Sequence, residues 1–243
     1  MQVYRELPVI TNQARRRPAE LVGVVSVTED WTVARHGALA EEIIAKEADF
    51  VLDAGTGMYL NAIVLDIPLA PKVPAELRRR AEKAVEGEPN PRRAARAREL
   101  ELAGAAARGA IWDGDLRYDT SIVYLRPEKH DLDAAIDERS RSITLNGLQE
   151  AGRLREMASA GTRISPQVMG SVGVRELLGH LAGTISLQQA QELIATRTRR
   201  LARRQMRWFD KLARTMEGRA RITVVQSTEH RIDLHNMHDI LGI

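Results

Sequence analysis

The sequence contains no cysteine, few aromatic residues and few lysines. Without cysteine, disulfide bonds, thiolate metal sites and cysteine nucleophiles are excluded. Phenylalanine, tryptophan and tyrosine make up 4% of the 243 residues, so a core must consist mainly of Leu, Ile, Val and Ala. No apolar run approaches the ~18 residues of a membrane-spanning helix, and the N-terminus lacks a signal-peptide pattern. We therefore expect a cytoplasmic protein with no membrane partner.

The basic residues are almost all arginine, and their densest run lies towards the C-terminal end. Lys and Arg total 36 against 33 acidic residues, yet six arginines fall in the stretch "TRTRRLARRQMRW", from Thr196 to Trp208. The planar guanidinium binds phosphate in a bidentate way and stacks on bases, which an ammonium cannot do. Clustered arginine therefore points to an anionic partner more strongly than the small net charge of +3 does.

On a helix this stretch separates into two faces. The face expected to pack against the core contains Ile194, Thr198, Leu201, Gln205, Trp208 and Leu212. The opposite face contains Arg199, Arg200, Arg203 and Arg207. No acid occurs between Glu192 and Asp210, so these charges repel one another unless something anionic faces them. The pattern predicts contact with a nucleic-acid backbone; a solvated charged face is the alternative.

Hydrophobic patterning predicts alternating strands and helices first and mostly helices later. We expect a buried strand at 21–27, a helix at 31–48 and a short β run that ends in the glycine turn of Gly55 and Gly57. The polar, alanine-rich stretch 71–108 predicts a helical hairpin or insertion. A strand at 121–127, helices at 132–159, 172–181 and 186–216, and a last strand at 221–227 complete the prediction.

Five segments, in order, resemble the tRNA dimethylallyltransferase family, the tRNA isopentenyltransferases that prenylate the adenosine 3′ of the anticodon. They are "MQVYR", "DAGTGMYL", "IDERSRSITLNGLQE", "VGVRELLGHLAGTISLQQA" and the arginine-rich "TRRLARRQMRWF". The resemblance implies an α/β fold with a P-loop kinase-like parallel sheet core, a helical insertion and a helical C-terminal part. It places the core and the tRNA-binding helices in residues 1–70 and 115–243, and a shortened insertion in 71–114.

The reaction implied by the resemblance moves a dimethylallyl group from dimethylallyl diphosphate to the exocyclic amine of adenosine in the tRNA anticodon loop. It needs a base near the amine and a cationic cradle around the departing diphosphate. Two catalytic residues carry over from the family's motifs: Thr56 near the reacting amine and Arg139 on the diphosphate. From the residue types alone, two other interpretations stay open. Thr56 could belong to a plain strand-to-helix turn, and Arg139 could form a surface ion pair with Asp137 or Glu138.

The resemblance also implies a set of tRNA-binding residues, in a protein that we expect to be a monomer. These are Met1, Gln2, Arg92, Arg93, Arg96, Gly173, Arg175, Arg199, Arg200, Arg203, Arg204 and Gln205. Trp208 is predicted to be a core residue because it lies on the apolar stripe. Val174 stands where the family has tyrosine, and Ala54 where it has glycine.

The sequence departs from the family at the diphosphate cradle. No Gly-x-x-x-x-Gly-Lys-[Ser/Thr] motif occurs, so the family's first strand and P-loop are missing, and its aspartate base would stand two residues before Met1. The family implies Mg²⁺ as cofactor. The alternative function is a non-catalytic RNA-binding relic of the family. We expect no metal site at the histidines of the C-terminal stretch "EHRIDLHNMHD".

Overall fold

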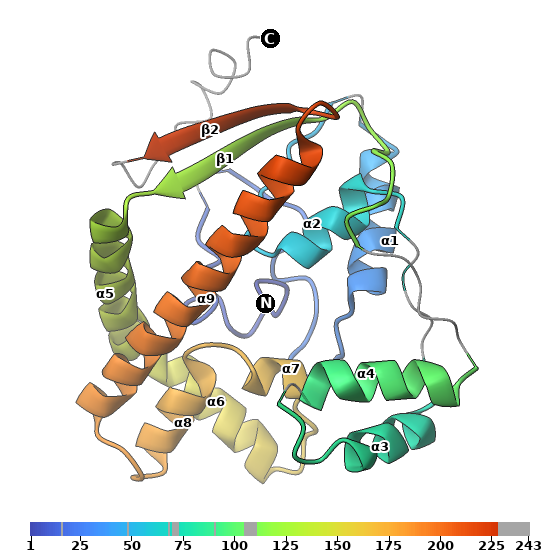
Figure 1. Ribbon diagram of the computed structural model, residues 1–243. Helices are drawn as coiled ribbons and strands as arrows, with labels where there is room; N and C mark the ends of the chain where they lie inside the picture. Colours follow the sequence, from blue (N-terminus) through green and yellow to red (C-terminus); the bar gives the residue numbers. More distant parts are fainter. Residues whose placement is uncertain are drawn as a thin grey trace.

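A computed structural model describes residues 1–15, 17–47, 49–67, 69, 73–89, 91–104 and 111–227. Helices form most of the regular structure (Figure 1). In chain order the elements are α1 (Val33–Ile44), α2 (Gly57–Val64), α3 (Ala75–Ala84), α4 (Pro91–Leu102), β1 (Ser121–Pro127), α5 (Lys129–Asn146), α6 (Leu148–Ser159), α7 (Pro166–Met169), α8 (Val174–Leu181), α9 (Leu187–Met216) and β2 (Arg221–Ser227). The predicted C-terminal histidines lie outside the described residues.

The two described strands, β1 and β2, pair in parallel, in register from Ser121 with Arg221 to Pro127 with Ser227. A parallel pair needs a crossover connection, and here α5 to α9 supply it. The strands lie at one end of the molecule, and α9 runs from them towards α8 (Figure 1). Both strands were predicted from their β-branched residues, so the α/β class with parallel strands is confirmed.

Helix α9 begins where its sequence supplies a capping box. The Ser186 hydroxyl accepts a hydrogen bond from the N–H of Gln189 at 3.1 Å, and the Gln189 side chain accepts one from the N–H of Ser186 at 2.7 Å. This reciprocal pair satisfies two N–H groups that have no partner within the helix. The helix then runs for 30 residues to Met216, in agreement with the predicted 186–216.

Two predicted strands are absent from the described structure. Residues 21–27 form only an isolated bridge between Val25 and Tyr4, and the run before Gly55 has no strand pairing. Val25 and Val27 are buried as a strand pattern would require, but Val51 is 68% exposed. The backbone of 23–25 does bond to residues 2–5, through Gly23 N–H to Gln2, Val25 N–H to Val3 and Arg5 N–H to Val25, but this pairing is too short to form a strand. The run before Gly55 has no such pairing among the described residues.

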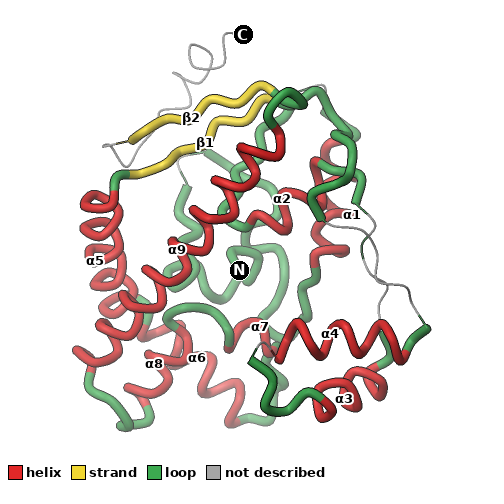
Figure 2. The backbone as a smooth tube through the Cα atoms, in the orientation of Figure 1, coloured by secondary structure: helices red, strands yellow, loops and turns green. Residues whose placement is uncertain are grey.

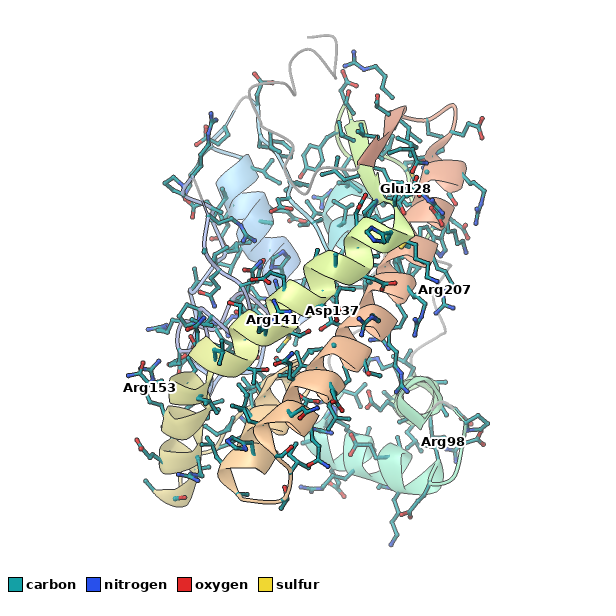
Figure 3. The ribbon with its side chains drawn as sticks, turned by 90° about the vertical axis from the view of Figure 1, so that its left-hand side faces the viewer. Arg98, Glu128, Asp137, Arg141, Arg153 and Arg207 are labelled. Atoms are coloured by element: carbon teal, nitrogen blue, oxygen red, sulfur yellow. The ribbon has the colours of Figure 1, made fainter. Side chains whose placement is uncertain are left out.

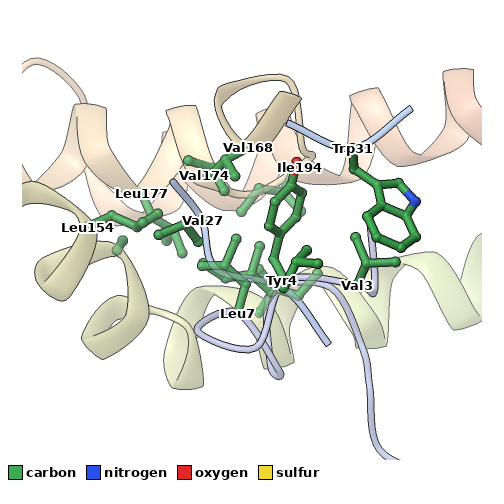
Figure 4. Packing of buried hydrophobic residues seen from close by; sticks show 14 residues of the cluster. Val3, Tyr4, Leu7, Val27, Trp31, Leu154, Val168, Val174, Leu177 and Ile194 are labelled. Carbon is green, nitrogen blue, oxygen red and sulfur yellow. The ribbon is translucent and has the colours of Figure 1, made fainter. Parts of the chain in front are cut away.

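The largest apolar cluster surrounds the irregular N-terminal segment. Tyr4 and Leu7 are fully buried, and they pack with Leu154 of α6, Leu177 of α8 and Ile194 of α9 (Figure 4). The segment itself is drawn as loop between these helices (Figure 2). A loop inside a core must find partners for its backbone polar groups.

Glu150 of α6 supplies such partners. Its two carboxylate oxygens accept hydrogen bonds from the backbone N–H groups of Val9 at 2.7 Å and of Ile10 at 2.9 Å, and the residue is 2% exposed. By accepting two hydrogen bonds, this carboxylate satisfies backbone N–H groups that have no partner in a helix or strand. Glu150 therefore holds the N-terminal segment in the core.

Residues 75–102 form the helical hairpin that the sequence predicts. Helices α3 and α4 pack against each other, and the nearly buried Glu99 of α4 joins them. Its carboxylate pairs with Arg78 of α3 at 3.6 Å and with Arg96 of α4 at 2.6 Å. In Figure 1 the hairpin lies at the opposite end of the molecule from the strands. The assignment of 71–114 as a separate insertion remains a prediction.

We predict that Glu150→Ala destabilises the protein by about 2–3 kcal/mol, because it leaves two buried N–H groups without an acceptor. Glu156→Ala is the matched control, since Glu156 lies on the same helix and is exposed. Urea unfolding followed by circular dichroism measures both. Equal stability of the two variants would contradict the role of Glu150.

Candidate functional site

Thr56 lies at the N-cap of α2, between Gly55 and Gly57, and its side chain is exposed. A threonine at this position usually accepts a hydrogen bond from an N–H of the first helical turn. The Thr56 side chain makes no such bond. Its hydroxyl is therefore free to meet a ligand, as the catalytic prediction requires.

The glycines beside Thr56 make room for α9 and do not serve a left-handed turn. Gln205 of α9 donates a hydrogen bond to the Gly55 carbonyl, and a Cβ on Gly57 would lie 2.0 Å from Cδ1 and Nε1 of Trp208. Neither glycine has a positive φ. The expected turn glycines are thus explained by close approach of a helix.

These contacts place the predicted stripe of α9 against the glycine turn. Trp208 packs against Gly57 and Trp112 but is only partly buried, so the prediction of a core residue holds only in part. Leu201 is the exception, since it is 38% exposed. The buried residues of α9 lie at or before Ala195 and from Leu212 onwards, so its middle crosses the turn without entering an apolar core.

Arg139 of α5 is partly buried and has no carboxylate partner among the described residues. The alternative of an ion pair with Asp137 or Glu138 is therefore wrong, because those acids pair with Arg199 and Arg141 respectively. Burial lowers the pKa of the Arg139 guanidinium, and the positive charge of Arg15 lowers it further. Two guanidinium groups that disfavour each other's charge are stabilised by an anion between them.

The sequence reasoning missed Arg15, although it stands in the visible run "ARRRP". One of its terminal nitrogens donates to the Gln2 side-chain oxygen at 2.7 Å and lies 3.8 Å from the exposed Asp53 carboxylate. Gln2 in turn donates to the Asn12 carbonyl at 2.6 Å. Gln2 is therefore positioned by the segment that carries Arg15, while Met1 is 47% exposed.

A second group missed from the sequence is aromatic. The rings of Trp31, His36 and Tyr59 contact one another edge to face, with centroids 5.7 Å apart for Trp31 and His36 and 4.9 Å for His36 and Tyr59. Burial lowers the pKa of His36 and raises that of Tyr59, which favours the neutral form of both rings. Tyr59 follows Thr56 by one helical turn, so the cluster lies beside α2, with Trp31 buried and the Arg35 guanidinium over the Trp31 ring at 5.0 Å.

The arginine face of α9 is only partly balanced by acids. Arg199 pairs with Asp133 at 3.3 Å and with Asp137 at 2.5 Å, so the expectation that no acid faces it is wrong. Both acids come from α5, which lies beside α9 (Figure 3). Three of the predicted tRNA contacts have an exposed side chain and form no ion pair in the described structure: Arg200, Arg203 and Arg204. Arg207, which was not among the predicted tRNA contacts, is also exposed and forms no ion pair there.

The remaining predicted tRNA contacts have different surroundings. The side chains of Arg92 and Arg93 lie outside the described part, and Arg96 pairs with Glu99. Gly173 has a φ of +102° at the N-cap of α8 and donates its N–H to Glu176 at 2.9 Å, which explains the glycine structurally. Arg175 beside it is exposed. Their contacts with RNA stay predictions.

The described residues contain no group of three histidine, aspartate or glutamate side chains that could hold a metal ion. The exposed Asp53 lies beside Arg15. No helix in the described part of the chain is long and apolar enough to cross a membrane.

Comparison with known proteins agrees with this geometry. A family model described as IPP transferase matches residues 2–105 and 86–212. The chain belongs to the IPP transferase family. A tRNA dimethylallyltransferase of Rubrobacter xylanophilus is 60% identical over 247 residues, which cover 100% of this chain and 85% of the relative. One from Phenylobacterium zucineum is 31% identical, over 86% of this chain and 78% of that protein.

Solved structures of family members share the fold. The tRNA isopentenylpyrophosphate transferase of Bacillus halodurans has a TM-score of 0.67 at 20% identity, covering 99% of this chain and 84% of that one. A eukaryotic dimethylallyltransferase, described as acting on tRNA, has a TM-score of 0.68 at 21% identity, covering 98% and 67%. The similarity extends over nearly the whole chain, so the predicted family is confirmed.

We predict that Arg139→Gln weakens binding of inorganic diphosphate about tenfold to hundredfold, because a hydrogen bond to a charged group contributes about 1.5–3 kcal/mol. Arg141→Gln is the control on the same helix, since Arg141 is exposed and already pairs with Glu138. Isothermal titration calorimetry measures both affinities. If the two variants bound diphosphate equally well, Arg139 would not be part of the anion site.

Proposed function

We propose that this protein transfers a dimethylallyl group from dimethylallyl diphosphate to the exocyclic amine of the adenosine 3′ of the anticodon in tRNA. Membership of the family and 60% identity to a tRNA dimethylallyltransferase over the whole chain support an enzyme with tRNA as substrate. The alternative, a non-catalytic RNA-binding relic, is not favoured by so high an identity to a protein named for the reaction. Within the structure, the proposal rests on the Arg139 guanidinium, which is partly buried and has no carboxylate partner among the described residues.

The reaction forms one bond and breaks one. The adenosine nitrogen donates its electron pair to the allylic carbon, the carbon–oxygen bond to diphosphate breaks, and the oxygen takes that electron pair while the nitrogen loses a proton to a base. Negative charge grows on the leaving oxygen in the transition state, so preorganised cations lower the barrier more than they strengthen substrate binding.

The described residues provide for the two ends of this reaction. Arg139 and Arg15 provide the positive charge that binds and stabilises diphosphate. The Thr56 hydroxyl, which is free of a helix-capping bond, hydrogen-bonds the amine and orients its electron pair. Mg²⁺, when bound, would supply further positive charge to the diphosphate.

The tRNA meets the exposed arginines of α9. Arg200, Arg203 and Arg204 stand on a helix whose middle also contacts the Thr56 turn, so a phosphate backbone held there lies beside the reaction site. The phosphates of this backbone balance the positive charges of the exposed arginines, which have no acidic partner in the described structure. The proposal includes a monomeric enzyme in the cytoplasm, because its tRNA substrate is found there.

Transfer is tested by incubating the protein with tRNA, dimethylallyl diphosphate and Mg²⁺ and analysing the digested tRNA by mass spectrometry. We expect one dimethylallyl group on the adenosine next to the anticodon. Absence of that product, with tRNA still bound, would reject the proposal and favour the relic.

Thr56→Val keeps the shape of the side chain and removes its hydroxyl. We predict that kcat falls about tenfold, as expected for loss of one hydrogen bond in the transition state, and that the Kd for tRNA stays unchanged. Thr56→Ser is the control, because it keeps a hydroxyl and should retain most of the activity. An inactive serine variant with an active valine variant would show that the hydroxyl has no part in the reaction.

The salt dependence of tRNA binding tests the arginine face. We predict that Arg203→Gln reduces the slope of log K against log salt concentration by about 0.7–0.9, because one phosphate contact is lost. Arg199→Gln should leave the slope nearly unchanged, since Asp133 and Asp137 already balance that charge. Equal slopes for wild type and Arg203→Gln, measured by filter binding, would mean that this face does not meet RNA.

A further inference from the structure

Two residues of α9, Gln205 and Trp208, contact the glycines on either side of Thr56. The Gln205 amide donates to the carbonyl of Gly55, and the Trp208 indole lies against the Cα of Gly57. The two side chains are one helical turn apart, so they project from the same face of α9. Between them they fix the residue before and the residue after the exposed threonine.

The fit between Trp208 and Gly57 is steric. A Cβ on Gly57 would meet two atoms of the indole at 2.0 Å, and the nearest neighbours of that position all belong to Trp208. The backbone of Gly57 has no positive φ, so alanine would be tolerated there by the backbone alone. Glycine is therefore needed at this position because of the tryptophan.

The contact supports the first turn of α2 and lies outside the fully buried parts of α9. Trp208 buries its Nε1 without a hydrogen-bond partner in the described structure, which costs about 1–3 kcal/mol. Helix α2 has only eight residues and no side-chain cap at Thr56, so its first turn needs an outside support.

The same indole connects the turn to the segment that follows the insertion. Its ring lies 4.8 Å from that of Trp112, and the Lys211 ammonium lies 4.6 Å from the Trp112 ring. The fully buried Asn61 of α2 donates to the Ile111 carbonyl at 3.0 Å. Helix α2, the segment at 111–112 and the middle of α9 therefore form one packed unit around the turn.

We propose that Gln205 and Trp208 are positioning residues for the transfer reaction, which hold the Thr56 hydroxyl where the adenosine amine reacts. This inference rests on the proposed function and assigns Gln205 a different role from the tRNA contact that the sequence predicts. The exposed Arg203 and Arg204 directly precede Gln205 on α9. RNA bound to these arginines therefore stabilises the position of the helix that supports the turn.

Gln205→Met tests the amide, since methionine has a similar length and cannot donate the hydrogen bond. We expect kcat to fall about tenfold, by loss of one hydrogen bond that orients the reacting group, with the Kd for tRNA unchanged. Hydrogen exchange of the amides at 55–60, measured without substrates, should become faster. Gln188→Met is the matched control, because Gln188 lies on the same helix and is exposed.

A pair of substitutions tests the steric fit. Gly57→Ala should lower kcat strongly, because its Cβ displaces the turn from Trp208. Trp208→Leu removes the flat ring, and in the double variant it should restore part of the activity that Gly57→Ala loses. This rescue is a coupling between neighbours that a general loss of stability would not produce. Activities that combine additively would overturn the steric part of the proposal.

The outcomes separate the two proposals. A wild-type protein without transfer would reject the proposed function, whereas unchanged exchange at 55–60 in Gln205→Met would reject the positioning role whatever the activity. A Kd for tRNA raised about tenfold in Gln205→Met, with kcat and exchange unchanged, would identify Gln205 as an RNA contact and overturn the inference. Gln205→Met lies outside the buried parts of α9, so the test does not depend on a variant that fails to fold.

Discussion

The structure depends on one long helix that is anchored in two separate apolar clusters. Near its start, α9 buries Ile194 with the N-terminal segment and α8; near its end it buries Leu212 and Met216 with α2 and the region of β2. A 30-residue helix spans about 45 Å, so the clusters fix its direction across the molecule. Its middle is free from core packing and can therefore present one face to the Thr56 turn and another to an outside ligand. A shorter helix anchored at one end could not hold both faces in place.

The arginines on and around α9 fall into two groups, according to whether an acid of the protein pairs with them. Arg199 is balanced by Asp133 and Asp137, and Arg126 of β1 pairs with Asp210 of α9 at 3.1 Å, so these pairs join α9 to its neighbours. The Asp210 carboxylate also accepts the Tyr124 hydroxyl, and burial together with Asp210 raises the pKa of Tyr124 to about 12. The guanidinium groups of Arg200, Arg203 and Arg204 keep their charge available. The proposed function thus assigns contacts within the protein and contacts with RNA to different arginines of one sequence run.

Local sequence predicted the elements that carry their own signals. Strands β1 and β2 follow β-branched runs that end at a proline or a polar stretch, and α9 starts at a Ser-x-x-Gln box. Long-range contacts were the source of the errors: the acids that pair with Arg199 lie 66 and 62 positions away, and the segment 21–27 pairs with residues 2–5 only over a single bridge. Thr56 and Arg139 came from family resemblance. Arg15 was overlooked because its proximity to Arg139 arises only when the N-terminal loop folds against α5.

The surroundings of Arg139 leave its positive charge without a negative partner in the described structure. A guanidinium that is partly removed from water, near a second one and without a carboxylate, loses hydration that no protein group replaces. A structural arginine in such a position would be expected to acquire an acid, as Arg199 has. On the proposed function, an anionic substrate supplies the missing charge, most fully as negative charge develops on the departing diphosphate. The guanidinium groups then stabilise the transition state more than the bound substrate, which lowers the barrier.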